Sequence, residues 1–217
     1  MGRRLLSPSR SVDHDQGRGF RRVLPRVGAV AAIVGGSVMV VHQVWDDREP
    51  GIEVGVVSSA LHTTWVTLLF VAFAGLGALQ RSAFGRLGRI GTVLAVAGSG
   101  GIAVLALFET FFRAISPQSS GDDPPVVFLV LIFALMGCYI AGGLLFAWAT
   151  MRARVLHWSA GAALIVAMLL KMFASGLLPF TLAMAGAAFI WLGISALAVL
   201  RSQRSQRSGL SSESAAV

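Results

Sequence analysis

Four ionisable side chains interrupt the apolar stretches of this 217-residue sequence: His42, His62, Glu109 and Lys171. An ionisable group inside a hydrophobic span is costly, so each of the four is by default a candidate for function. The set combines one acid, one ammonium group and two imidazoles. That chemistry suits an ion pair, a proton relay, an ion pathway, or a pocket for a metal or small molecule.

The acid and the ammonium group are each other's predicted partners. Glu109 is the only acid within the predicted spans, and Lys171 is the only fixed cation there apart from Arg113 at the end of the third span. A buried charge is destabilising unless it is paired. The structural interpretation is a Glu–Lys pair that joins two helices. A second interpretation is that Lys171 and His42 extend to the membrane surface and reach water.

The same residues also suggest a metal or haem site as an alternative. His42, His62 and Glu109 could form a two-histidine, one-carboxylate set for zinc or iron, and the two histidines could ligate haem. The sequence has no i, i+4 histidine pair, and Lys171 would repel a metal cation. We therefore predict no cofactor.

Catalysis finds little support in the remaining residues. Cys138, the single cysteine, lies within an apolar run and is predicted to be a buried structural thiol. Asp46, Asp47 and Glu49 predict a solvated acidic outer loop, or else a vestibule that concentrates cations. No HExxH, CxxC, GxGxxG or Walker loop is present, so we expect a protein that is not an enzyme.

The composition requires a lipid environment for these groups. The chain is 55% hydrophobic and 13% charged, whereas soluble domains average about 25% charged residues. The net charge of +8 comes from 17 arginines and one lysine against ten acids. Because these arginines gather in tails and short loops, they indicate membrane topology and not nucleic-acid binding.

Six segments are long and apolar enough to cross a bilayer, for which about 20 residues are needed. The predicted fold is therefore all-α, a polytopic bundle of six transmembrane helices. The predicted spans are 27–45, 55–79, 90–114, 125–150, 157–176 and 180–200. Pro179 favours a tight hairpin between the last two spans, and the alternative is one long kinked helix. Residues 1–26 and 201–217 are expected to be disordered tails.

The loops alternate in charge along the chain. Arginines occupy both tails and the loops at 80–89 and 150–156, whereas acids occupy the loops at 46–54 and 115–124. By the positive-inside rule, both termini are predicted to be cytoplasmic, in a bacterial plasma membrane.

With this orientation, the four ionisable residues fall in one slab roughly 5–10 Å below the outer surface. Small residues spaced three and four apart mark the faces on which membrane helices pack. His42 continues the small-residue stripe Gly28–Ala31–Gly35, and Lys171 continues Ala160–Ala163–Ala167. Glu109 continues a similar stripe through Ala106, and Ala134, Cys138 and Gly142 form another stripe in the fourth span. The side chains of His42, Lys171 and Glu109 are therefore predicted to point into the bundle. His62 shares a helix face with Ser58 and Trp65, and its direction is left open.

Three stretches carry a resemblance to a group of proteins: GRLGRIGTVLAVAG, FETFF and MRARVLHWSAGAALIVAML. They resemble small multi-pass membrane proteins of actinobacteria, over about residues 81–170. The resemblance implies a membrane bundle and carries over no activity or site residues.

The sequence thus predicts an integral membrane protein with a buried polar layer near its outer face, as in a small transporter or channel-like protein. A structural or regulatory subunit of a membrane complex is the first alternative, and a membrane-embedded metal- or haem-binding protein is the second. The predicted partners are the lipid bilayer and either further copies of the chain or a second membrane protein, and no nucleic acid.

Overall fold

The computed structural model describes residues 12–48, 56–115, 126–174 and 180–214, and these residues form six helices. The helices are α1 (Val12–Arg48), α2 (Val56–Gln80), α3 (Arg86–Ile115), α4 (Val126–Ala153), α5 (Trp158–Ala174) and α6 (Thr181–Ser214). The predicted all-helical fold is confirmed over these ranges.

Five of the helices, all except α5, are long and apolar enough to cross a membrane. The apolar part of α5, Trp158–Phe173, is shorter than the apolar parts of the other five helices. At a rise of about 1.5 Å per residue, 16 residues extend about 24 Å, which is less than a bilayer core of about 30 Å. The apolar helices mark the chain as an integral membrane protein.

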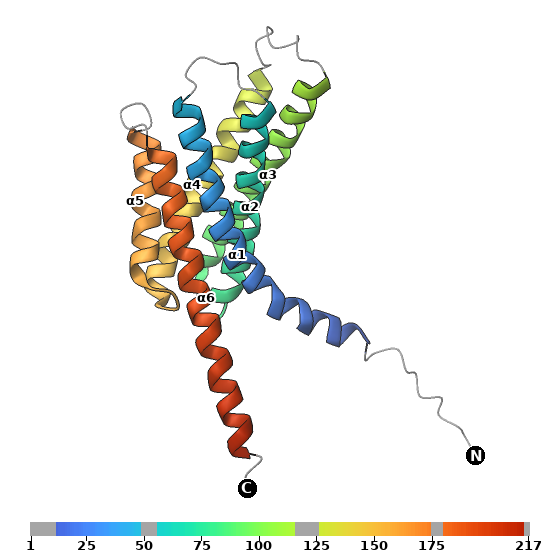
Figure 1. The fold of residues 1–217 in the computed structure, drawn as a ribbon, viewed down its shortest axis with the longest axis vertical. Helices are drawn as coiled ribbons and strands as arrows, with labels where there is room; N and C mark the ends of the chain where they lie inside the picture. The colour runs from blue at the N-terminus through green and yellow to red at the C-terminus, as the bar shows by residue number, and fades with distance from the viewer. Residues whose placement is uncertain (1–11, 49–55, 116–125, 175–179, 215–217) are drawn as a thin grey trace, which may run out of the picture.

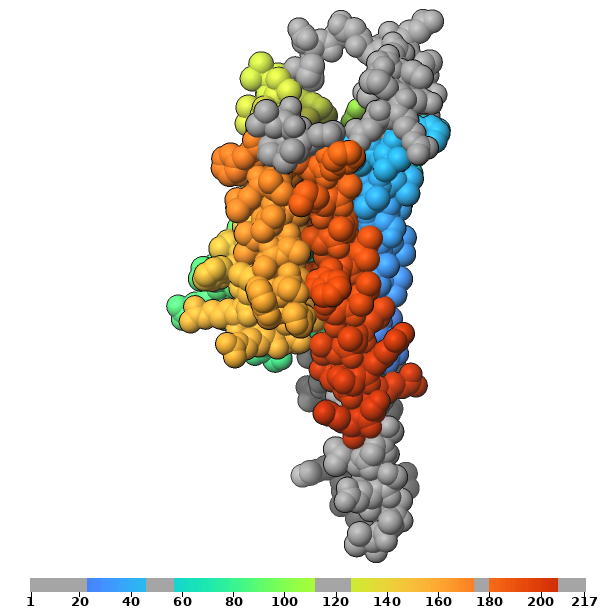
Figure 2. All heavy atoms as spheres, turned by 60° about the vertical axis from the view of Figure 1, so that its left-hand side comes forward, coloured from blue at the N-terminus to red at the C-terminus, as the bar shows by residue number. Residues whose placement is uncertain are grey.

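The helices form a ring in chain order. Each one packs against its neighbours in sequence, and α6 closes the ring against α1 (Figure 1). Helices α5 and α6 lie side by side as separate antiparallel helices (Figures 1 and 2), so the hairpin prediction is confirmed and the single kinked helix is wrong. Pro179 itself lies outside the described residues.

Aromatic side chains fill the middle of this ring. The Phe73 ring of α2 meets the rings of Tyr139 and Phe146 in α4 at 6.2 and 5.3 Å, and that of Phe189 in α6 at 5.4 Å. All of these contacts are edge-to-face, the geometry that aromatic pairs favour. Because α2, α4 and α6 alternate around the ring, a side chain that contacts all three lies near its axis. The axis is therefore packed at this level and does not form an open pore.

Glycine pairs allow α1 to approach both of its neighbours closely. A Cβ atom on Gly28 would overlap the backbone of Gly75 in α2, and one on Gly36 would overlap the carbonyl oxygen of Gly186 in α6. Close backbone approach through small residues is how membrane helices associate, since lipid offers no hydrophobic driving force between helices.

The small-residue stripes place most but not all faces correctly. Gly28, Ala31 and Gly35 are buried, as the first stripe predicts. In α4, however, Ala134 is exposed, and the span Val126–Ala153 is the least buried of the five long apolar helices. The first half of α4 therefore presents small residues away from the bundle, because α3 and α5 pack mainly on the rest of the α4 surface.

The first and last helices of the chain extend beyond their predicted ends. Residues 12–26, expected to be disordered, belong to α1, and residues 201–214, also expected to be disordered, belong to α6. Figure 1 shows the start of α1 leaving the bundle at an angle. Pro25 lies inside this helix, where it removes a backbone hydrogen bond and causes a bend.

Most of the described arginines gather at one end of the bundle. The start of α1 and the end of α6 lie at the same end (Figure 1). The turns between α2 and α3 and between α4 and α5 also lie there and carry Arg81, Arg152 and Arg154. We call this the basic end, and the other the distal end. Trp148 and Trp158 are exposed near the basic end and Trp45 near the distal end, as expected for tryptophans at membrane interfaces.

Candidate functional site

Lys171 reaches across the ring to Trp65. Its Nζ atom lies 5.1 Å from the centroid of the Trp65 ring, within the range of a cation–π interaction. Lys171 belongs to α5 and Trp65 to α2, which are opposite helices in the six-membered ring. A contact between opposite helices places both side chains near the axis. Trp65 precedes Phe73 by eight residues, so the contact lies about 12 Å from the aromatic core, toward the distal end.

Two histidines extend the same cluster. The His62 ring packs edge-on against Trp65, with centroids 4.9 Å apart, and the His42 ring lies 5.9 Å from that of His62. The buried His42 also shares a hydrogen bond with Ser58, with 3.1 Å between Nε2 and Oγ. The structure therefore brings His62 and Lys171 against one indole, and places His42 next to His62. We call these residues and Trp65 the distal polar cluster.

The fourth predicted residue, Glu109, lies on an exposed part of α3. The prediction that it points into the bundle is therefore wrong. Glu109 and Thr110 lie three and four residues after Ala106, so either could continue the stripe of Ala106. Thr110 takes the inward position, and its hydroxyl lies 2.9 Å from that of Thr63 in α2. The structure gives no ion pair between Glu109 and Lys171. A neutral hydroxyl is less costly than a carboxylate between packed helices.

Trp65 contributes a buried donor to the cluster. Its side chain is 5% exposed, and its indole nitrogen has no hydrogen-bond partner among the described residues. A buried indole N–H usually finds an acceptor, so this one is available for a bound group. Sequence reasoning placed Trp65 on the face of His62 but not at the centre of the cluster. Its mid-span position, away from the interface where tryptophans gather, is the signal that could have identified it.

The geometry bears directly on the metal and haem alternatives. Among the described residues, no group of three or more His, Cys, Asp or Glu side chains could hold a metal ion. The rings of His42 and His62 contact each other, and Nε2 of His42 bonds Ser58.

The acidic loop can be placed only in part. Asp46 and Asp47 belong to the last turn of α1, one turn beyond His42, and Glu49 lies outside the described residues. Cys138, in contrast, is half-buried on α4, away from the distal polar cluster.

A second polar contact lies near the basic end. The Gln80 amide donates to the hydroxyl of Thr150 at 3.2 Å, and both side chains are fully buried. It joins α2 to α4 on the other side of the aromatic core from Lys171. The bundle thus has polar contacts at both ends and an apolar centre, a pattern that closes the axis to water in this conformation.

No protein-family model, curated protein or solved structure matches the chain. The site therefore has to be interpreted from its own geometry.

Proposed function

We propose that this chain binds a small solute with an anionic group at the distal polar cluster and carries it across the membrane as a small transporter. The observation that supports this proposal is the ammonium group of Lys171 against the Trp65 ring, on the axis of the ring and without an ion pair among the described residues. An ammonium group in a low-dielectric site attracts an anion strongly.

The neighbouring groups suit an anion as well. The indole N–H of Trp65 is a donor without a protein acceptor in the described chain. A carboxylate or phosphate beside Lys171 and the indole nitrogen of Trp65 would accept hydrogen bonds from both groups. The cluster therefore has the polarity of an anion site, and not that of a metal site.

The aromatic core limits the mechanism. Phe73, Phe146 and Phe189 are fully buried between the distal polar cluster and the basic end. A solute bound at Lys171 would cross only if these rings moved apart, so the proposal is a transporter that changes conformation and not a permanently open channel. We propose further that the basic end faces the cytoplasm, which would make the distal polar cluster outward-facing.

Titration of the purified protein with small carboxylates at constant ionic strength tests the proposal. Thermal stability is the readout, because a ligand that binds the folded state raises it. The series pairs acetate with glycine and succinate with aspartate, since Asp46 and Asp47 lie one turn beyond His42 and would favour a solute with an amino group. At least one compound should raise the melting temperature.

Two variants at one position make the test specific. Lys171→Met should abolish the stabilisation, and Lys171→Arg should retain it, because the arginine keeps the charge and its affinity for an aromatic face. Arg81→Ala, which removes an exposed charge at the basic end, is the matched control and should behave as the wild type. Equal stabilisation of the wild type and Lys171→Met would contradict the proposal.

One observation favours the subunit alternative. Gly137 of α4 is exposed, and a Cβ atom added to it would meet no atom within 4 Å. Ala134 and Ala141 are exposed on either side of it, which gives the small-residue spacing of a helix–helix contact. Co-purification of a second membrane protein, lost on Gly137→Leu substitution, would support a role within a complex.

A further inference from the structure

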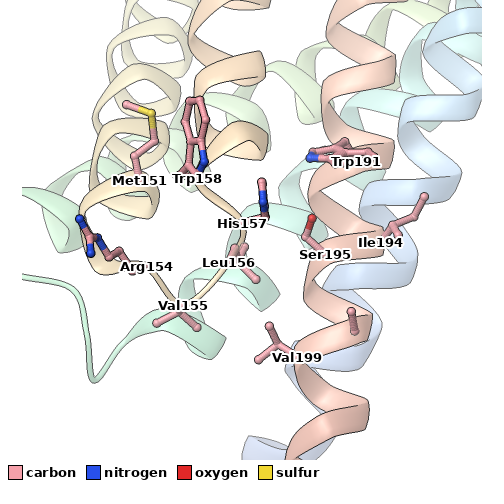
Figure 3. Close-up of a pocket in the computed structure, with 11 residues that line it drawn as sticks. Met151, Arg154, Val155, Leu156, His157, Trp158, Trp191, Ile194, Ser195 and Val199 are labelled. Carbon is pink, nitrogen blue, oxygen red and sulfur yellow. The ribbon is translucent and has the colours of Figure 1, made fainter.

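A cavity of about 820 Å³ lies at the basic end, between the turn that joins α4 to α5 and the outer face of α6. Figure 3 shows the side chains that line it, with Arg154 at one edge and Trp191 and Ile194 at the opposite edge. It lies far from the distal polar cluster, and the proposed function leaves it unused. We propose that this cavity binds an anionic phospholipid of the leaflet at the basic end.

The cavity has the two-part polarity of a lipid site. Its floor is formed by aliphatic side chains, namely Val155, Leu156, Ile194, Ala198 and Val199. Its polar groups include Arg154, His157 and Ser195, and no acidic side chain of the described residues lines it. An acyl chain would lie over the aliphatic floor, and a phosphate would lie at the Arg154 edge. Basic pockets between membrane helices suit anionic lipid headgroups in this way.

Two tryptophans fix the depth of the cavity in the membrane. Trp158 is 63% exposed and Trp191 is 49% exposed, so both face the surroundings of the bundle. Tryptophan side chains concentrate at the level of the lipid headgroups. In Figure 2, α5 and α6 lie side by side on the face that carries this cavity. A phospholipid could therefore enter from the bilayer with its headgroup already at the level of Arg154.

A hydrogen-bonded chain holds the walls in place. The indole of Trp191 donates to Ser159 Oγ at 3.1 Å, and His157 Nδ1 lies 2.6 Å from the same oxygen. The Ser159 hydroxyl thereby joins α5, α6 and the turn between α4 and α5. The exposed ring of His157 lies among the side chains that line the cavity (Figure 3). The site is therefore preorganised for a phosphate and does not need to form on binding.

The backbone at Arg154 is the unusual feature of the site. Its φ angle is 50°, in the left-handed region, where glycine is the favoured residue. An arginine in this position strains the turn but places a guanidinium group at the cavity edge. Arg154→Gly should relieve the strain and remove the headgroup contact at the same time. A loss of lipid binding in this variant can therefore be distinguished from a loss of folding stability.

Native mass spectrometry of the purified protein in detergent, titrated with phosphatidylglycerol, tests the proposal. The wild type should bind phosphatidylglycerol more tightly than phosphatidylcholine. Arg154→Gly should weaken phosphatidylglycerol binding about fivefold, the effect of one arginine at an anionic membrane surface, while its melting temperature stays equal or rises. Arg154→Lys should retain most of the affinity. Arg81→Ala removes a charge at the basic end that does not line this cavity, so this variant should bind phosphatidylglycerol as the wild type does.

Three results would overturn the proposal. The first is wild-type affinity of Arg154→Gly for phosphatidylglycerol, and the second is equal binding of phosphatidylcholine by the wild type. The third is displacement of phosphatidylglycerol by millimolar glycerol phosphate, which would identify a site for a soluble phosphate instead of a lipid. Because none of these measurements involves Lys171, their failure is distinguishable from failure of the transporter proposal.

Discussion

Lys171 Nζ lies 5.1 Å from the centroid of the Trp65 ring, and this contact joins two helices that face each other across the bundle. The sequence suggested a carboxylate as the partner of this lysine, and the structure provides an aromatic face. An aromatic ring stabilises a cation through its quadrupole and leaves the charge unneutralised. The lysine therefore remains able to bind an anion, which it could not do as readily in an ion pair.

The Lys171–Trp65 contact should be measurable as a coupling energy. We expect Lys171→Met, Trp65→Leu and the double variant to give a coupling of about 0.5–2 kcal/mol in the free energy of unfolding in detergent, the range of cation–π pairs. Lys171→Met paired with Trp148→Leu is the control, because Trp148 is exposed near the basic end. Strict additivity of Lys171→Met and Trp65→Leu would refute the contact.

The approach of α1 to α2 should tolerate no side chain at Gly28. Gly28→Ala places a methyl group against the backbone of Gly75, so we expect a loss of about 1–3 kcal/mol of stability, as for other overpacked contacts. Gly137→Ala is the matched control: its added methyl group meets open space, and alanine favours a helix by up to about 1 kcal/mol over glycine. Thermal unfolding measures both, and equal effects would show that α1 and α2 do not meet at this point.

The orientation can be tested with single cysteines in a Cys138→Ser background. Ser82 is exposed in the turn between α2 and α3 at the basic end, and Glu53 precedes α2 at its distal end. We expect a membrane-impermeant maleimide to label Glu53→Cys in intact cells and Ser82→Cys only after lysis. Labelling of Ser82→Cys before lysis would reverse the proposed orientation and turn the distal polar cluster toward the cytoplasm.

The small-residue stripes predict which helix face is buried where a neighbouring helix packs along the whole stripe, but not where that packing ends. The stripe Gly28–Ala31–Gly35 is buried along its length, because α1 has neighbours on two sides. The same spacing failed at Glu109 and Ala134, both of which lie toward the distal ends of their helices. A small-residue stripe shows that a surface can be approached closely, but it does not show which neighbour approaches or over what length.

Composition and periodicity by themselves determined the class of this protein. A chain that is 55% hydrophobic and interrupted by short arginine-bearing turns forms apolar helices, because lipid leaves no other way to satisfy the backbone of a spanning segment. The spacing of the turns likewise fixed the order of the helices and the gathering of cations at one end.

Only the tertiary structure decided which polar groups meet. Trp65 and Lys171 are 106 positions apart in sequence, and their contact depends on the closure of the ring by α6 against α1, which sets α2 opposite α5. The cavity edged by Arg154 and Trp191 depends instead on the packing of α6 beside α5, together with a backbone conformation at Arg154 that arginine rarely adopts. Such contacts arise from how whole helices pack, and the residue types along each helix do not specify them.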